Sequence, residues 1–506
     1  VMEASLGLGE GGQSNSKSRR REFDDVLDEI GQGGWQLPLI AILCSGNLAG
    51  SMQLTALTFV IPCAAAELEL RDEETSTIQA VQFLGCILGS TVLGPLSDQK
   101  GRKAMYVVCL SIMAFFGLMT SFSQSGLTLI ISQMAVGFGH GGKIACFSYL
   151  PEAIPSRQRG LVCMLASTTW GIGSILIAST AWIFLSIYGW RFLMVVTSSL
   201  ALVSLFLILT LPESPRWLLS KGWNVKAANA LKLLALKNGV TLDEALELKD
   251  HLPIDINSDP IQDNNIKHSQ TAAKAFMTLL SKPLWWTTAL FSIMAMSCGA
   301  CYIGLISLIA RIFEESIGGL PACTFRYSDI LISASAESSF TFFSSFWIEH
   351  GRRWTQFVCF GLYSAPVIML GFTDSSHPDL LLRLVLFSFS ARGCISAACN
   401  ANWIASQEQY PTNVRATSGS LFYVLSCLGA SVSSYLVYTG VPVMIVCVSL
   451  ASFGAVSALC ALFTKETAGL HLIDNAVEMT HEEGDQYPSE STAAGYQAIV
   501  LSSHKR

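Results

Sequence analysis

The chain has 506 residues, of which 51% are hydrophobic and only 13% carry a charge, and its formal net charge is −6. Soluble domains carry roughly twice that fraction of charged residues, so a soluble fold is excluded for most of the chain. The net charge indicates no particular partner, and we expect none among nucleic acids.

A polar segment, residues 1–35, precedes a series of long apolar stretches. A helix needs about 20 apolar residues to cross the hydrocarbon core of a bilayer, and only helices or closed barrels satisfy the backbone there. The sequence therefore predicts an all-α membrane protein with twelve transmembrane helices. We expect them at approximately 37–64, 77–97, 104–122, 127–149, 161–186, 191–211, 284–310, 327–347, 355–372, 380–402, 418–438 and 441–463.

A charged, glycine-containing turn, Gly94–Lys103, separates the second and third stretches, and a weaker echo, Glu349–Arg353, lies in the second half. Such turns cannot lie in lipid, so both mark connections on one side of the membrane. Lys and Arg gather in the short loops of that side, which indicates the cytoplasm. Both termini are then cytoplasmic, in a plasma membrane or an intracellular vesicle.

The chain also repeats its charge spacing. Glu152 is followed seven positions later by Arg159, and Glu408 seven positions later by Arg415. The alternative is two accidental pairs, but each also follows a Gly-Arg turn at a similar distance. We therefore expect two pseudo-symmetric six-helix bundles, as in transporters with internal repeats. They are residues 36–211 and 283–463, with a cytoplasmic N-terminal tail (1–35), central loop (212–282) and C-terminal tail (464–506).

Within the central loop, Val225–Lys237 has the apolar periodicity of a helix. The 15 cysteines lie almost all in apolar stretches and show neither a disulfide framework nor the spacing of a metal site. We expect no metal and no cofactor. There is no GxxxxGK[ST] phosphate loop, which argues against an ATP-driven pump, and no constellation of catalytic residues suggests an enzyme.

Two ionisable residues fall in the middle of apolar stretches, Glu337 and Arg392. Charges at membrane depth are costly and usually functional. Both lie a dozen or more residues before a cytoplasmic loop, so they could meet at a similar depth. One interpretation is a buried structural ion pair; the other is that Glu337 binds a cation or proton and Arg392 sets its charge.

Four more residues are candidates for a solute site. His140 and Lys143 share one helix face, where the lysine could attract an anionic group or pair with the cytoplasmic cluster. Trp170 and Asn400 would suit the lining of a cavity, although a lone aromatic residue is more often a packing residue.

The motifs together resemble the major facilitator superfamily over about residues 36–463. Within it the chain is most similar to the synaptic vesicle glycoprotein 2 group and its related proteins, and to the organic-ion transporters. The residues that carry the resemblance are Gly94, Asp98 and Gly101–Lys103, the two Glu/Arg pairs, Pro212–Leu219, Phe59–Pro62, Phe147–Tyr149, Trp170, Ala336–Glu337 and Ala391–Arg392.

The resemblance implies two bundles that rock around a central site, with a network of charges that holds the cytoplasmic gate. Asp98 would cap a helix N-terminus of the opposite half, where the helix dipole favours an anion. The other members expected in this network are Arg102, Glu152, Arg159, Glu213, Arg216, Arg352, Glu408 and Arg415.

The chain also departs from the family pattern. Gly50 and Gln53 stand where acids are usual, and Gln133 stands where an arginine is usual, which argues against proton coupling through these positions. The segment from Arg311 to Arg326 is too short for the luminal insertion of the synaptic vesicle glycoproteins. We expect a secondary transporter of a small organic solute, an organic ion or sugar-like, monomeric in the bilayer, with or without a coupling ion. The alternative is a transport-inactive vesicle-membrane protein with a regulatory or binding role.

Overall fold

The computed structural model describes most of the chain between residues 33 and 467. The described ranges are 33–155, 159–239, 272–282, 284–317, 325–372, 380–410, 412–438 and 441–467, with isolated positions at 27–28, 30–31 and 323. Within them, a few side chains are not described, among them those of Asp98 and Glu349. Most of the predicted tails, and residues 240–271 of the central loop, lie outside these ranges.

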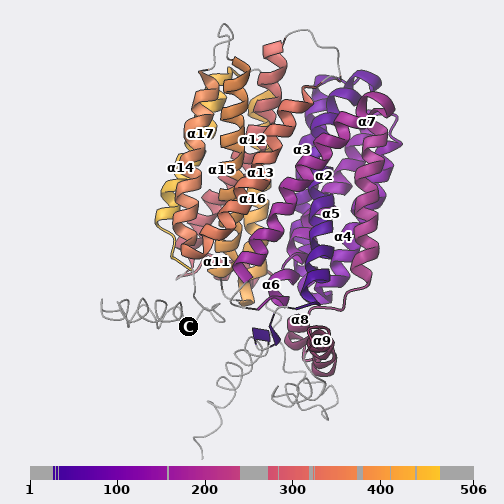
Figure 1. Ribbon diagram of the computed structural model, residues 1–506, viewed down its shortest axis with the longest axis vertical. Helices are drawn as coiled ribbons and strands as arrows, with labels where there is room; N and C mark the ends of the chain where they lie inside the picture. Colours follow the sequence, from indigo (N-terminus) through magenta and orange to yellow (C-terminus); the bar gives the residue numbers. More distant parts are fainter. Residues whose placement is uncertain are drawn as a thin grey trace, which may run out of the picture.

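Helices of the first half form one bundle (Figure 1). They are α2 (Gln36–Leu68), α3 (Asp72–Lys100), α4 (Arg102–Ser121), α5 (Gly126–Cys146), α6 (Tyr149–Ala153) and α7 (Arg159–Leu209). Two helices of the central loop follow, α8 (Pro215–Ser220) and α9 (Asn224–Lys237). The helix predicted at Val225–Lys237 is thus confirmed.

The second half forms a bundle beside the first (Figure 1). Its elements are α11 (Ala272–Leu279), α12 (Trp285–Ile317), α13 (Tyr327–Trp347), a 3₁₀ turn η2 (Ile348–His350), α14 (Arg352–Gly371), α15 (Leu380–Glu408), α16 (Thr412–Tyr438) and α17 (Val443–Leu462).

Every predicted apolar stretch falls on a helix. The stretches 161–186 and 191–211 both lie in α7, which consists of two helices separated by a break at Gly189 (φ 74°, ψ 177°). Glycine adopts this left-handed conformation without the steric cost that a Cβ imposes. One residue therefore suffices to reverse the chain between two spanning helices.

In the described part of the chain, nine helices are long and apolar enough to cross a membrane, with α7 counted once. The helices α5 and α13 are not among the nine, and both carry polar side chains into the bundle interior, such as Lys143 and Glu337. Their buried polar groups lower the hydropathy that marks a span. The protein is a multi-pass integral membrane protein.

Close packing inside the first bundle depends on glycine. Gly85 and Gly89 of α3 face the α5 backbone at Met134 and Phe138, where an added Cβ would lie 2.1 and 1.9 Å from the two carbonyl oxygens. On α5, Gly137 makes the reciprocal approach to α3. In lipid, where burial of apolar surface gives no drive for association, this close approach supplies the van der Waals contact that holds helices together.

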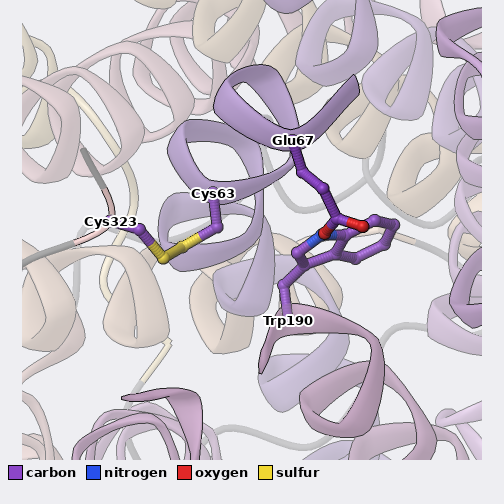
Figure 2. The surroundings of a disulfide bond; sticks show 4 residues. All are labelled: Cys63, Glu67, Trp190 and Cys323. Atoms are coloured by element: carbon purple, nitrogen blue, oxygen red, sulfur yellow. A yellow bond between two sulfur atoms is a disulfide. The ribbon is translucent and has the colours of Figure 1, made fainter. Parts of the chain in front are cut away.

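The two ends of the bundles differ in chemistry. At one end, which we call the basic-turn end, lie the turns Gly101–Lys103 and Gly351–Arg353. At the other, which we call the disulfide end, a disulfide joins Cys63 of α2 to Cys323, which precedes α13 (Figure 2). The expectation that the cysteines form no disulfide was wrong, because Cys63 falls at the outer edge of an apolar stretch that hydropathy alone assigns to lipid.

Between the bundles, α7 packs on α13 and α3 packs on α16. Gly171 of α7 lies so close to α13 that an added Cβ would be 2.7 Å from the backbone nitrogen of Ser338 and 2.8 Å from the Cβ of Glu337. The interface is therefore tight beside Glu337, and it encloses the site described next.

Candidate functional site

A cavity of about 240 Å³ lies between the two bundles. Helices α2, α3, α5 and α7 of the first half line one side, and α12, α15 and α16 of the second half line the other. Its aromatic lining comprises Phe83, Phe147, Trp170, Tyr302, Trp403, Phe422 and Tyr423. Its polar lining includes Asn47, His140, Lys143, Ser167, Ser396, Asn400, Asn402, Ser406 and Ser426. Four of the six predicted solute-site residues, His140, Lys143, Trp170 and Asn400, are in this lining.

The other two, Glu337 and Arg392, lie beside the cavity. Arg392 donates through Nε to Oε1 of Glu337 at 2.5 Å. The side chain of Glu337 is fully buried, and that of Arg392 is 7% exposed. Each charge removed from water is thus matched by the other, as the high cost of an unpaired buried charge requires.

A chain of hydrogen bonds connects this ion pair to the cavity wall and to the opposite bundle. The indole of Trp170 donates to the Tyr302 hydroxyl at 2.8 Å, and that hydroxyl donates to Glu337 at 3.0 Å. Ser174, one turn after Trp170 on α7, donates to the second carboxylate oxygen at 2.9 Å. We call these five residues, Trp170, Ser174, Tyr302, Glu337 and Arg392, the buried polar chain. Two of its hydrogen bonds, Trp170–Tyr302 and Ser174–Glu337, join the two bundles. The ion pair is therefore connected to the first half as well as to the second.

His140 and Lys143 lie on the first-half side of the cavity, and both are 1% exposed. The Lys143 amine donates to the carbonyl of Gly46 at 3.2 Å. Within the described part of the chain, neither ring nitrogen of His140 has a hydrogen-bond partner. The ring faces Trp170 edge-on, with centroids 5.7 Å apart. Lys143 thus points into the cavity region and does not join the cluster at the basic-turn end.

Asn400 contacts α13 across the second-half side of the cavity. Its amide nitrogen donates to Thr341 Oγ1 at 3.3 Å, and Thr341 is itself within 3.2 Å of Ser396 Oγ. These groups provide neutral donors and acceptors next to the aromatic surface. Such a mixture suits a small organic molecule with a polar group.

The glutamines noted as departures from the family pattern form neutral hydrogen bonds. Gln82 donates to Gln133 at 3.1 Å, and Gln133 donates to Thr120 at 2.9 Å. Gln53 donates to the carbonyl of Met113. Amides cannot release or take up a proton at physiological pH, so this part of the first bundle holds no titratable relay among these groups.

At the basic-turn end, the first half forms a polar network around the start of α4. Arg102 pairs with Glu152 at 3.2 Å, and Ser214 donates to the other oxygen of Glu152. Glu213 accepts from the backbone amides of Lys103 and Ala104, at 2.9 and 3.4 Å. A carboxylate at this position satisfies amides that have no partner within the helix and complements the helix dipole.

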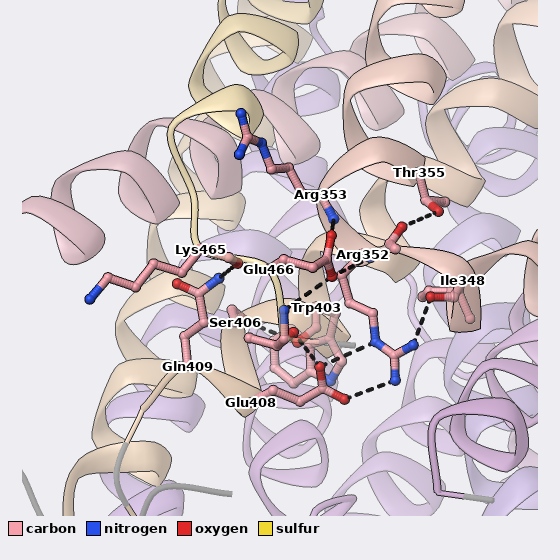
Figure 3. A network of polar contacts seen from close by, with 12 residues as sticks. Ile348, Arg352, Arg353, Thr355, Trp403, Ser406, Glu408, Gln409, Lys465 and Glu466 are labelled. Atoms are coloured by element: carbon pink, nitrogen blue, oxygen red, sulfur yellow. Dashed lines mark hydrogen bonds and ion pairs between the residues drawn. The ribbon is translucent and has the colours of Figure 1, made fainter. Parts of the chain in front are cut away.

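The second half repeats this network (Figure 3). Arg352 pairs with Glu408 at 3.3 Å. Thr467 donates to Glu408 at 2.6 Å. Glu466 accepts from the backbone amides of Arg352 and Arg353, at 2.8 and 3.1 Å. Arg352, Glu408, Glu466 and Thr467 therefore match Arg102, Glu152, Glu213 and Ser214.

The remaining predicted gate residues occupy different positions. Arg159 and Arg415 each reach back to a carbonyl five residues earlier, that of Ile154 at 3.4 Å and that of Tyr410 at 3.2 Å. Arg216 lies in α8 at the same end. Asp98 is on α3, and its side chain lies outside the described set. Its expected capping of an opposite-half helix is therefore left open, while Glu213 caps α4 from within its own half.

Sequence reasoning missed Glu466, which was placed in the C-terminal tail. A signal was present, because Glu466-Thr467 repeats Glu213-Ser214 at a distance of 253 residues, between the 250 and 256 that separate the other repeated pairs. Ser174 and Tyr302 were also missed. Serine and tyrosine are common in membrane helices, and no spacing rule identifies the two that meet one carboxylate.

Two helical bundles, a cavity enclosed between them and matched polar networks at one end define the architecture of a membrane carrier. The sequence profile of the Major Facilitator Superfamily matches residues 43–434, and the chain belongs to this family. The Arabidopsis thaliana protein "Organic cation/carnitine transporter 7" is 26% identical over 79% of this chain and 84% of its own length. The Rattus norvegicus "Synaptic vesicle 2-related protein" is 25% identical over 82% of this chain and 74% of its own length.

Solved structures agree with the fold. The proton:xylose symporter XylE bound to 6-bromo-6-deoxy-D-glucose superposes with a TM-score of 0.67 at 18% identity, over 86% of this chain and 97% of that one. The inward open conformation of XylE from E. coli gives a TM-score of 0.61 at 17% identity, over 86% of this chain and 98% of that one. At this identity the similarity establishes the fold alone.

Proposed function

We propose that the protein is a secondary transporter that moves a small organic solute across the membrane by alternating access. The observation that carries the proposal is the cavity, because residues of both bundles line it and it therefore opens when the bundles separate at either end. Both sides of the cavity come from one chain, which supports a monomer as the unit of transport.

The contacts between the bundles suit this motion. The buried polar chain crosses the interface through two neutral donors, Trp170 and Ser174, while the ion pair itself stays within the second half. Separation of the bundles therefore breaks two hydrogen bonds without separating opposite charges. A network of this kind can hold one state and release it at modest cost.

The orientation follows from two independent features. Lys and Arg in the short turns Gly101–Lys103 and Gly351–Arg353 favour the cytoplasm. The disulfide at the opposite end favours an oxidising compartment, which is the cell exterior or a vesicle lumen. Both features support our proposal that the basic-turn end lies in the cytoplasm.

Coupling to a proton, if it occurs, would require a titratable group that both sides reach in turn. The neutral Gln82–Gln133–Thr120 arrangement provides none, and Glu337 is already paired with Arg392. We therefore favour facilitated diffusion or exchange of the solute over proton symport through these groups.

Exchange in proteoliposomes tests the proposal. Labelled carboxylates, amines and sugars are offered against an internal pool of the same unlabelled compound. We expect exchange of at least one class, and we expect Tyr302→Phe to change its rate, because this variant loses the bridge between Trp170 and Glu337. Tyr435→Phe is the matched control, since Tyr435 is 73% exposed on the bundle surface. Failure of every class to exchange above protein-free liposomes would contradict the proposal.

One observation favours the second candidate, a transport-inactive protein with a regulatory or binding role. The Cys63–Cys323 disulfide ties α2 of the first bundle to the segment before α13 of the second. While this bond is intact, it restrains separation of the bundles at that end and so limits access to the cavity from there.

Removal of the disulfide distinguishes the two candidates. If the bond is a reversible restraint on a carrier, Cys63→Ser increases exchange relative to the wild type. If the protein has lost transport, Cys63→Ser exchanges no solute either, and the disulfide is only structural. The free Cys359→Ser variant is the control for loss of a thiol.

A further inference from the structure

The cavity between the bundles carries an unbalanced positive charge. Among the described residues that line it, Lys143 is the one that is formally charged at neutral pH, and none is Asp or Glu. Glu337, the acid of the buried polar chain, already has Arg392 as its partner. Within the described residues, the hydrogen bond of the Lys143 amine goes to a neutral carbonyl, that of Gly46.

Gly50 explains why no acid reaches this amine from α2. A Cβ added at Gly50 would lie 2.4 Å from the Lys143 amine and 2.9 Å from the nearest atoms of the His140 ring. A side chain at this position would therefore meet both groups. Glycine instead leaves the face of Lys143 and His140 without a counter-ion among the described lining residues.

His140 is the second, independent sign of a missing partner. Its ring is buried, lines the cavity and has no hydrogen-bond partner on either nitrogen in the described part of the chain. The centroids of the neighbouring rings of Trp170 and Tyr423 lie at 5.7 and 6.4 Å, and an N–H···π contact is weaker than a hydrogen bond. Buried polar groups are usually hydrogen-bonded. The imidazole N–H of His140, which has no acceptor among the described residues, lies beside the Lys143 ammonium, and together they point to a ligand with acceptor oxygens.

We propose that Lys143 and His140 form the subsite for a carboxylate group of the transported solute, with Gly50 keeping the site free of a competing acid. This proposal rests on the proposed carrier function and names its substrate class. A single ammonium balances one negative charge, so the solute is a monoanion. The aromatic part of the lining, including Phe83 and Trp403, accommodates an apolar body attached to the carboxylate.

Three probes of nearly equal size distinguish the effect of ligand charge on binding from the effect of ligand shape: benzoate, benzamide and benzylamine. Each is added to the full-length protein in detergent, and the midpoint of thermal unfolding is measured, because a ligand that binds only the native state raises it. We expect benzoate to raise the midpoint and the amide and amine to have no comparable effect.

Two pairs of variants locate the effect. Lys143→Met should weaken benzoate binding by roughly tenfold or more, the loss typical of a hydrogen bond to a charged group, whereas Lys143→Arg should retain part of it. Gly50→Asp should also abolish the benzoate response, because its carboxylate meets Lys143. Gly50→Ala adds the same Cβ without the charge and controls for crowding. Each variant is first checked for monodisperse elution and an unfolding midpoint without ligand.

The proposal is overturned if benzamide or benzylamine stabilises the protein as much as benzoate, if no probe has an effect, or if Lys143→Met responds to benzoate as the wild type does. Equal loss in Gly50→Ala and Gly50→Asp would also count against it. Failure of the carrier function gives a different result, in which benzoate stabilises the protein through Lys143 but no solute is exchanged. If the Lys143→Met variant still exchanges an amine or a sugar, the proposed carrier function stands and the carboxylate subsite is rejected.

Discussion

The two ends of the molecule are closed by different means. At the disulfide end, the bundles are joined to each other by the Cys63–Cys323 disulfide and by an aromatic cluster. In this cluster, the ring centroids of Phe59 and Phe325 are 5.3 Å apart. At the basic-turn end, the pairs Arg102–Glu152 and Arg352–Glu408 each join residues of one half. Across the halves at that end, an apolar cluster brings Met164 against Ile348, Ala401 and Ile404.

The difference indicates at which end the two bundles separate more easily. Among the described residues, separation at the basic-turn end exposes a small apolar cluster and keeps the pairs Arg102–Glu152 and Arg352–Glu408. Separation at the disulfide end requires a covalent bond to break and an aromatic cluster to come apart. The polar networks therefore stabilise each bundle as a rigid body, and the resistance to motion between the bundles is concentrated at the disulfide end and in the buried polar chain.

The largest effect is expected where a buried charge loses its partner. Glu337→Gln leaves Arg392 unpaired in the interior and should lower the free energy of unfolding by about 3–5 kcal/mol, measured by denaturant unfolding in detergent. The double variant Glu337→Gln with Arg392→Met should recover part of the loss, because it leaves no unpaired charge.

Arg71→Ala is the control for that prediction, since the Arg71–Glu74 pair lies at the surface with the arginine 81% exposed. It should cost about 0–1 kcal/mol. An equal loss in Glu337→Gln and Arg71→Ala would show that the buried polar chain does not hold the bundles.

Loss of the disulfide should have the next largest effect. Cys63→Ser or Cys323→Ser should reduce the free energy of unfolding by roughly 2–4 kcal/mol, and the double variant should lose no more than either single one. With a protease site in the central loop, cleaved wild-type protein should run as one band without reductant and as two with it. Two bands for the wild type without reductant would refute the covalent link.

A smaller and symmetric effect tests the two polar networks. Glu213→Gln and Glu466→Gln each remove a charge from a helix N-terminus, that of α4 and that of α14, and each should cost about 1 kcal/mol. Thermal unfolding of the two variants should shift by similar amounts. A loss confined to Glu213→Gln would mean that the repeat in sequence has no counterpart in stability.

Much of this architecture could be predicted from the sequence. Apolar length places the spanning helices, because the thickness of the bilayer fixes how many residues each needs. Spacing identifies Glu152/Arg159 and Glu408/Arg415 as a repeat, but it does not predict that Arg102 and Arg352 contact the two glutamates. The break in α7 was not predictable in form, because hydropathy does not distinguish a loop from a single glycine turn such as Gly189.

The site was predictable only in part. His140, Lys143, Trp170 and Asn400 were chosen because polar or flat side chains in apolar stretches are unusual, and the structure gathers them at one cavity. Which of them lack partners depends on the rotation of each helix, which the sequence does not specify. The same is true of the bond between Trp170 and Tyr302, because the two residues are 132 positions apart.

The central claim, that two rigid bundles rock about a shared cavity, is tested most directly by distances between them. Spin labels introduced as non-natural residues at Phe122 and Phe372 report on the disulfide end, and labels at Lys100 and Lys282 report on the basic-turn end; all four side chains are exposed. In the Cys63→Ser variant, we predict that the Phe122–Phe372 distribution gains a longer component while the Lys100–Lys282 distribution gains a shorter one. Distributions at both ends that are the same with and without the disulfide, and that do not change when benzoate is added, would contradict the account.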